Sequence, residues 1–324
     1  MKNYNLKLKI FRFCIVIFTF AFCILNLSEA NAQQVSLAIS PPLIQTVIKP
    51  GKAILIAYSL ENSGDPTILT ARVVSFEPKD NFGNIRLKDR AEGPVRFSLD
   101  NAELSLDQPF FLKTKASEQL LLRIRVPEGA PEGDYYYSLL AETTPAIGRE
   151  GIGSAQAKAT IAANILVTIS HSGTIEIKPK IVLFQLLSKM KWKIFDSFDE
   201  VPLVLVLENQ GKNLIRPEGK ITLRGLLGTS ADYEIVPKNI LAESQRLVQA
   251  TPSAEFSKQL ISLALSGFFL GPYKLSANIN FGENSPNIFA STSFFAFPFK
   301  LVAGIILVTI ITIFIIKRFS ADED

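Results

Sequence analysis

The stretch SLENSGDP occupies residues 59–66 and the stretch VLENQGKN occupies residues 206–213, so this chain of 324 residues contains Leu-Glu-Asn-x-Gly twice. Each copy follows a run of branched apolar residues, as the end of a β-strand does. Asparagine and glycine suit the left-handed backbone positions of a tight connection between strands. We therefore predict two equivalent structural turns, formed by Asn62, Gly64, Asn209 and Gly211.

A second pair of marks follows each copy at a similar distance. Gly133 and Tyr135 lie in GDYYYSLLA, and Gly271 and Tyr273 lie in GPYKLSANI. A glycine and then a tyrosine near the start of a late strand is typical of the tyrosine corner of Greek-key sandwiches, in which the phenol bonds to the backbone upstream. Because both marks recur in the same order, we predict two domains of one plan.

The periodicity between these marks is that of strands. In LLLRIRV at residues 120–126, leucine, isoleucine and valine alternate with Arg123 and Arg125, as in an antiparallel strand with one solvated face. Further short runs rich in branched or aromatic residues are bounded by turn residues; they lie at 53–60, 68–76, 135–141, 163–170, 201–208 and 219–225. This pattern predicts an all-β fold with two tandem Ig-like β-sandwich domains, at residues 33–170 and 174–293, joined by a linker at 171–173.

The N-terminus has the pattern of a secretory signal peptide. Four cations in the first dozen residues precede an apolar run at 14–27 and the small-residue stretch EANAQ. Ala30 and Ala32 fit the cleavage site, so we expect residues 1–32 to be removed and Gln33 to become the first residue. An uncleaved membrane anchor is the alternative, although the apolar run is short for a bilayer.

The C-terminus has the pattern of a membrane anchor. Leu301 to Ile316 are sixteen uncharged residues, which give about 24 Å of helix. Extending the segment back to Phe294 brings it to membrane thickness, with phenylalanines at the boundary, so we expect a transmembrane helix over 294–316. Lys317 and Arg318 then place the tail, residues 317–324, in the cytoplasm and the body outside the cell, as a single-pass type I protein. The alternative is a buried core helix.

Net charge argues against nucleic acid as a partner. The formal charge of the whole chain is +4, but most of the excess lies in the signal segment, and the expected exported body is nearly neutral. A nucleic-acid-binding body needs a basic field that neutralises phosphates.

Composition also argues against most catalytic chemistry. Cys14 and Cys23 lie in the expected signal peptide, and His171 is the one histidine in the chain. We therefore expect no disulfide, no metal site, no cofactor and no Ser-His-Asp or Cys-His system. A hydrolase that uses two carboxylates is the least favoured reading, because the nearby acids Glu132 and Asp134 are more simply interpreted as turn residues.

Two local stretches each have a plain interpretation and a functional one. KDNFGNI at 79–85 lacks the ligand spacing of a calcium loop and predicts a hairpin turn. SKMKWKIFDSF at 188–198 alternates lysine with apolar residues, which predicts an ordinary strand with solvated lysines or a contact with anionic lipid or wall polymer. The residues of that possible surface contact are Lys189, Lys191, Trp192 and Lys193.

Three segments resemble a known bacterial family. ISPPLIQTVIKPGKAILIAYSLENSGD (39–65) and VPEGAPEGDYYYSLL (126–140) resemble the N-terminal Ig-like domain of WxL-interacting surface proteins and related PapD-like modules, and VPLVLVLENQGKNLIRPEGKITLRGLLG (201–228) resembles the second domain of that family. In the family the first domain is implicated in peptidoglycan binding and the second in binding a partner surface protein. The acidic tail ADED departs from the basic tail that is typical there.

The resemblance implies a non-enzymatic adaptor on the bacterial cell surface that binds cell-wall polymer or another secreted or surface protein. The alternative is a membrane-anchored, PapD-like assembly chaperone that offers a sheet edge to an incoming strand.

Overall fold

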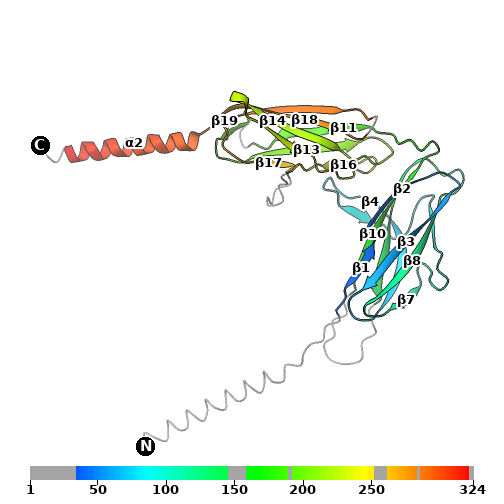
Figure 1. Cartoon of the computed structure of the whole chain (residues 1–324). Coiled ribbons are helices and arrows are strands. Elements are labelled where there is room, and N and C mark those ends of the chain that lie inside the picture. Colours follow the sequence, from blue (N-terminus) through cyan, green and yellow to red (C-terminus); the bar gives the residue numbers. More distant parts are fainter. Residues whose placement is uncertain (1–33, 145–157, 189–191, 252–260, 283–284, 321–324) are drawn as a thin grey trace, which may run out of the picture.

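The structure, a computed structural model, describes residues 34–144, 158–188, 192–251, 261–282 and 285–320. It contains two β-sandwiches in series and one C-terminal helix. The helix extends from the end of the second sandwich that lies farther from the first sandwich (Figure 1). The all-β fold class predicted above is therefore confirmed. The expected signal peptide, with Ala30 and Ala32 of its cleavage site, lies outside the described residues, as do Gln33, Lys189 and Lys191.

The first sandwich packs a sheet of order β1-β3-β8-β6 against a sheet of order β2-β10-β9-β4-β5, in which β7 also pairs with β4. Its strands are β1 (Leu37–Ser40), β2 (Leu43–Ile48), β3 (Ala53–Asn62), β4 (Thr67–Pro78), β5 (Ile85–Leu87), β6 (Arg96–Leu99), β7 (Pro109–Leu112), β8 (Ala116–Arg125), β9 (Gly133–Thr144) and β10 (Thr160–Ile169). In β8 the predicted alternation is observed, because Leu120, Leu122 and Ile124 are fully buried while Arg123 and Arg125 are exposed.

The second sandwich packs a sheet of order β11-β13-β16, in which β17 also pairs with β13, against a sheet of order β12-β19-β18-β14-β15. Its strands are β11 (Pro179–Leu186), β12 (Ile194–Asp196), β13 (Val201–Asn209), β14 (Glu218–Gly225), β15 (Ser230–Glu234), β16 (Gln245–Leu247), β17 (Leu263–Leu265), β18 (Gly271–Asn280) and β19 (Ile288–Phe297), with a short 3-10 helix η1 (Leu226–Gly228). Each sandwich has its own buried apolar core.

The two sandwiches share one topology. In the first, β1 pairs antiparallel with β3, and the next strand, β2, pairs parallel with β10 of the opposite sheet. In the second, β11 pairs antiparallel with β13, and β12 pairs parallel with β19. The chain thus crosses from one sheet to the other after its first strand in both sandwiches.

The repeated asparagine performs the same task in both sandwiches. The Oδ1 atom of Asn62, at the end of β3, accepts a hydrogen bond from Gly64 N at 2.9 Å, and its Nδ2 donates to Asp65 O at 2.8 Å. Asn209, at the end of β13, accepts from Gly211 N at 3.0 Å and donates to Asn213 O at 2.8 Å. Each amide also donates to a backbone carbonyl that is distant in the sequence, that of Leu112 for Asn62 and that of Ile240 for Asn209. Both side chains are buried, so each closes its turn and ties it to the rest of the sandwich.

The glycines of the motif have a different role from the one predicted. Gly64 and Gly211 do not have the left-handed backbone that the sequence suggested. Instead, each lies against the first segment of its own sandwich, where a Cβ atom on Gly64 would be 2.2 Å from Gln34 O and one on Gly211 would be 2.8 Å from Glu176 O. Glycine is required there because two backbones approach closely.

The two glycine–tyrosine pairs, Gly133 with Tyr135 and Gly271 with Tyr273, also occupy matching positions. β9 begins at Gly133 and β18 at Gly271, with φ of 138° and 89°. The phenol of Tyr135 donates to Pro131 O at 3.2 Å, and the phenol of Tyr273 accepts from Leu270 N at 3.3 Å. Both phenols therefore bond to the backbone just upstream of their strand, as expected from the tyrosine-corner pattern.

The C-terminal helix α2 (Phe299–Ser320) begins later than the expected boundary at residue 294. Phe294 and its three following residues belong to β19, and only Pro298 separates this strand from the helix. The stretch Phe299–Lys317 is long and apolar enough to cross a membrane, with a mean hydropathy of 2.7, and none of it is buried in the protein. The alternative of a buried core helix is therefore wrong.

We predict that replacing either motif asparagine destabilises the body, measured by chemical unfolding of residues 33–298. Asn209→Ala leaves several buried backbone groups without a partner, which we expect to lower the free energy of unfolding by about 3 kcal/mol; Asn62→Ala has the same effect on the first sandwich. The matched control is Asn278→Ala on the exposed face of β18, expected to change it by less than about 0.5 kcal/mol. Equal effects at all three positions would contradict the shared role.

Candidate functional site

One carboxylate lies at the centre of the contact between the two sandwiches, which we call the joint. Asp134, near the start of β9, accepts hydrogen bonds from Asn213 Nδ2 at 2.9 Å and Leu214 N at 2.5 Å, both in the second sandwich. Within the first sandwich it accepts from Thr168 Oγ1 at 2.7 Å. Its own N–H donates to Lys212 O at 3.1 Å. The joint thus uses the segment directly after the second Leu-Glu-Asn-x-Gly motif.

Tyr136 extends the joint on the same face of β9. Its phenol accepts a hydrogen bond from Ala242 N at 2.7 Å and donates to Asp134 Oδ2 at 3.2 Å. Its ring stacks on Phe76 with centroids 5.7 Å apart, and burial raises the pKa of the phenol. The apolar cluster that both sandwiches share here consists of Phe76, Ile85, Tyr136, Leu166, Leu214 and Leu241.

The β4–β5 hairpin makes a third contact between the sandwiches. Asp80 closes the turn by accepting from Phe82 N at 2.9 Å, and its hydrogen bond from the Asn84 side chain lowers its pKa. The hairpin predicted for residues 79–85 is confirmed. Asn81 O accepts from Leu247 N of β16 at 2.6 Å, so the turn reaches the second sandwich. No group of three or more acids, histidines or cysteines able to hold a metal is found in the part of the chain that the structure describes.

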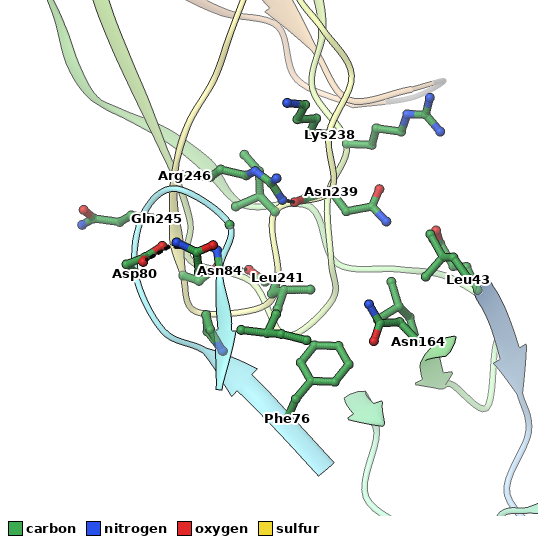
Figure 2. Close-up of a pocket in the computed structure, with 18 of the residues that line it drawn as sticks. Leu43, Phe76, Asp80, Asn84, Asn164, Lys238, Asn239, Leu241, Gln245 and Arg246 are labelled. Carbon is green, nitrogen blue, oxygen red and sulfur yellow. Dashed lines mark hydrogen bonds between the residues drawn. The ribbon is translucent and has the colours of Figure 1, made fainter. Parts of the chain in front are cut away.

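Beside this joint lies a cleft of about 390 Å³, which we call the joint cleft (Figure 2). Its floor is the outer face of the first sandwich, and its wall is the 237–246 segment of the second. The first sandwich contributes Leu43, Gln45, Phe76, Asp80, Asn164 and Leu166, among others, and the second contributes Arg216, Lys238, Asn239, Leu241, Gln245 and Arg246, among others.

The charge of the joint cleft is positive. Arg216, Lys238 and Arg246 line it together with one acid, Asp80, whose carboxylate is occupied by its own turn. Arg246 donates from Nη1 to Asn239 O at 2.7 Å, while its Nε is buried without a hydrogen-bond partner. Burial lowers the pKa of this guanidinium. The cleft thus combines apolar surface with cations, which suits an extended segment that carries a carboxylate.

Trp192 and Lys193, the two described residues of the possible surface contact, do not line the joint cleft. Trp192 is 82% exposed and lies just before β12, which begins only at Ile194. Lys193 has a positive φ of 51° and donates to Thr292 Oγ1 at 3.0 Å. The described end of this stretch is therefore not the regular alternating strand that the sequence suggested.

The acids read as simple turn residues have further roles. Glu132 accepts from the backbone N of the linker residue His171 at 2.7 Å, and this hydrogen bond lowers the pKa of Glu132. Asp134 holds the joint, as described above. The sequence signal for these roles is weak: two acids flank a glycine at the start of a strand, and their partners lie far along the chain.

We predict that Asp134→Ala loosens the joint without unfolding either sandwich. The amides of Leu214 and Ala242, bound by Asp134 and by its neighbour Tyr136, should exchange with solvent at least about tenfold faster, as expected when a charge-assisted hydrogen bond is lost. Asp232→Ala is the control, because Asp232 also accepts two side-chain hydrogen bonds but lies on exposed β15. Unchanged exchange at both amides in Asp134→Ala would contradict the role of this carboxylate.

Comparison with known proteins yields resemblances of fold at low identity. No protein-family model matches the chain, and no curated protein matches it. The class 5 fimbriae chaperone CfaA is 12% identical, with 79% of this chain and 99% of that chain covered and a TM-score of 0.40. The E. coli chaperone DraB is 14% identical, with 81% of this chain and 98% of DraB covered and a TM-score of 0.38. A chain in the complex of the Salmonella enterica SafA pilin with the SafB chaperone is 10% identical, with 81% of this chain and 98% of that chain covered and a TM-score of 0.34.

Proposed function

We propose that this chain is an exported, single-pass membrane protein whose body binds an extended segment of another secreted or surface protein, without turnover of that partner. The observation that carries the proposal is the joint cleft, in which apolar residues and three cations surround one space between the two sandwiches. Export is supported by the N-terminal sequence, and anchoring by the apolar, unburied helix α2. Lys317 and Arg318 support a cytoplasmic tail.

The edge of β2 favours an extended partner. Among the described strands, β2 pairs only with β10, so its other edge has unpaired backbone groups. Leu43 is 47% exposed and Val47 is 51% exposed along this strand, and Leu43 also lines the joint cleft. A strand added at this edge gains main-chain hydrogen bonds, while a carboxylate of the partner reaches the cations of the cleft.

The same edge supports the second candidate, an anchored assembly chaperone. A chaperone and an adaptor both use strand addition, but they differ in the partner. A chaperone's client aggregates when released, whereas an adaptor's partner is folded on its own. Cell-wall polymer remains a proposal from the family resemblance, and the experiment below includes it as a separate outcome.

A photo-cross-linking amino acid placed at residue 43 in cells tests the site. We expect it to capture a protein partner at one segment, whereas the same probe at residue 278, on the exposed face of β18, does not. The captured segment is then made as a synthetic peptide, and its affinity for the body is measured.

Charge reversal in the cleft provides the quantitative prediction. Arg216→Glu with Lys238→Glu should weaken peptide binding by at least about tenfold, because two cations that face the carboxylate are replaced by acids. Lys220→Glu with Lys274→Glu, the same charge change elsewhere on the second sandwich, should leave affinity within about twofold. Binding to purified, protein-free wall that is unaffected by the cleft variants would contradict the proposal and favour wall polymer as the ligand.

A further inference from the structure

Exposed apolar side chains gather at the end of the second sandwich from which α2 leaves. Phe198 follows β12, Leu226 follows β14, and Phe268 and Leu270 precede β18; they are 61%, 57%, 57% and 52% exposed. The rings of Phe198 and Phe268 are in contact, with centroids 5.1 Å apart. We call these four residues the apolar tip.

Strand register places the apolar tip beside the start of the helix. Gly271, directly after Leu270, pairs with Ala296, which is two residues before Pro298. Gly225, directly before Leu226, pairs with Tyr273 in the same sheet. The connections that carry the tip therefore lie at the level where β19 passes into α2 (Figure 1).

The loop before β18 holds its apolar residues in place. Phe269 is buried, and its ring packs edge-on against Tyr273 and Phe294 at 5.3 and 5.8 Å. Its backbone N donates to Ser197 O at 3.0 Å, which links this loop to the one that carries Phe198. Because Phe269 fills the core, its neighbours Phe268 and Leu270 are directed to solvent, where exposed apolar side chains are costly unless a partner covers them.

The first turn of α2 is fixed to the same loops. Lys300 N donates to the buried carboxylate of Asp196 at 2.9 Å, and Phe198 N donates to the other oxygen at 3.2 Å. Lys300 also forms an ion pair with Asp199. With only Pro298 between β19 and the helix, α2 cannot swing far from the tip without breaking these contacts.

Helix length sets the level of the membrane surface. The nineteen residues Phe299–Lys317 form the candidate span, which measures about 28 Å, close to the hydrocarbon thickness of a bilayer. The candidate span therefore has no spare length, so the hydrocarbon boundary lies near Phe299. Loops level with that residue lie in the interfacial layer, where aromatic side chains are favoured.

Resting on the proposed membrane anchoring, we propose that the apolar tip is immersed in the outer interface of the bilayer that α2 crosses. The body then stands on the membrane in a fixed orientation, held by the helix and by loops from three different connections. The occupant of the tip is lipid, because the tip is continuous with a helix that is itself covered by lipid.

The test uses the mature chain reconstituted in vesicles of phosphatidylcholine and phosphatidylglycerol. Since Cys14 and Cys23 lie in the expected signal peptide, single cysteines carry the fluorophore NBD at chosen positions. Phe268→Cys places the label on the apolar tip. Val308→Cys places it in α2 and tests whether the helix is in the bilayer. Phe111→Cys, at a residue 59% exposed on the first sandwich, is the control for a label in water. Thermal unfolding of each labelled protein checks that the fold is kept.

We expect lipids with a doxyl group near the headgroup to quench the label at residue 268 at least twofold more than the label at 111, and deep doxyl lipids to quench the label at 308. Quenching at 308 with none at 268 would overturn the tip proposal and leave the anchor intact. No quenching at 308 would show that the proposed anchoring itself fails. A blue shift at 268 that depends on protein density, without doxyl quenching, would show that a second copy covers the tip and would also overturn the proposal.

Discussion

The carboxylate of Asp134 is the interaction on which the arrangement of the two sandwiches depends. It accepts hydrogen bonds from Thr168 and Tyr136 on its own side and from Asn213 and Leu214 on the other. A half-buried carboxylate with this many donors is held in one position, since moving either sandwich leaves charge and amides unpaired. The joint cleft exists because this contact, the shared apolar cluster and the β4–β5 hairpin fix both of its sides.

The joint between the sandwiches is built on the turn after β13, which also closes the second sandwich. Asn209 closes the turn after β13, and Asp134 binds the backbone of the residues that follow it. At the other end of the second sandwich, Asp196 caps the start of α2 in a comparable way. The second sandwich is thus tied at one end to the first and at the other to the helix, which gives the cleft a defined orientation relative to the membrane in our proposal.

The general fold was predictable from the sequence, and the site was not. Alternation in β8 and the repeated marks predict strands and a shared plan, because both are local signals. Sequence does not show why a glycine is needed, so the repeated motif predicts left-handed turns where Gly64 and Gly211 in fact make close backbone contacts. The phenylalanines at the end of β19 run directly into an apolar helix, and composition alone does not mark that boundary. Asp134 and Tyr136 bind partners about 80 and 106 residues away, and no local pattern identifies such pairs.

Two sandwiches that form one rigid body with a fixed cleft keep a constant separation in solution. Spin labels at Gln119 on β8 and Asn278 on β18, in a mature body expected to have no cysteine of its own, allow double electron–electron resonance to measure the distance between the sandwiches directly. A rigid joint predicts a single narrow distance distribution in solution that matches the structure. A broad or multiple distribution in the unmodified joint would contradict it, because the cleft would then have no defined shape.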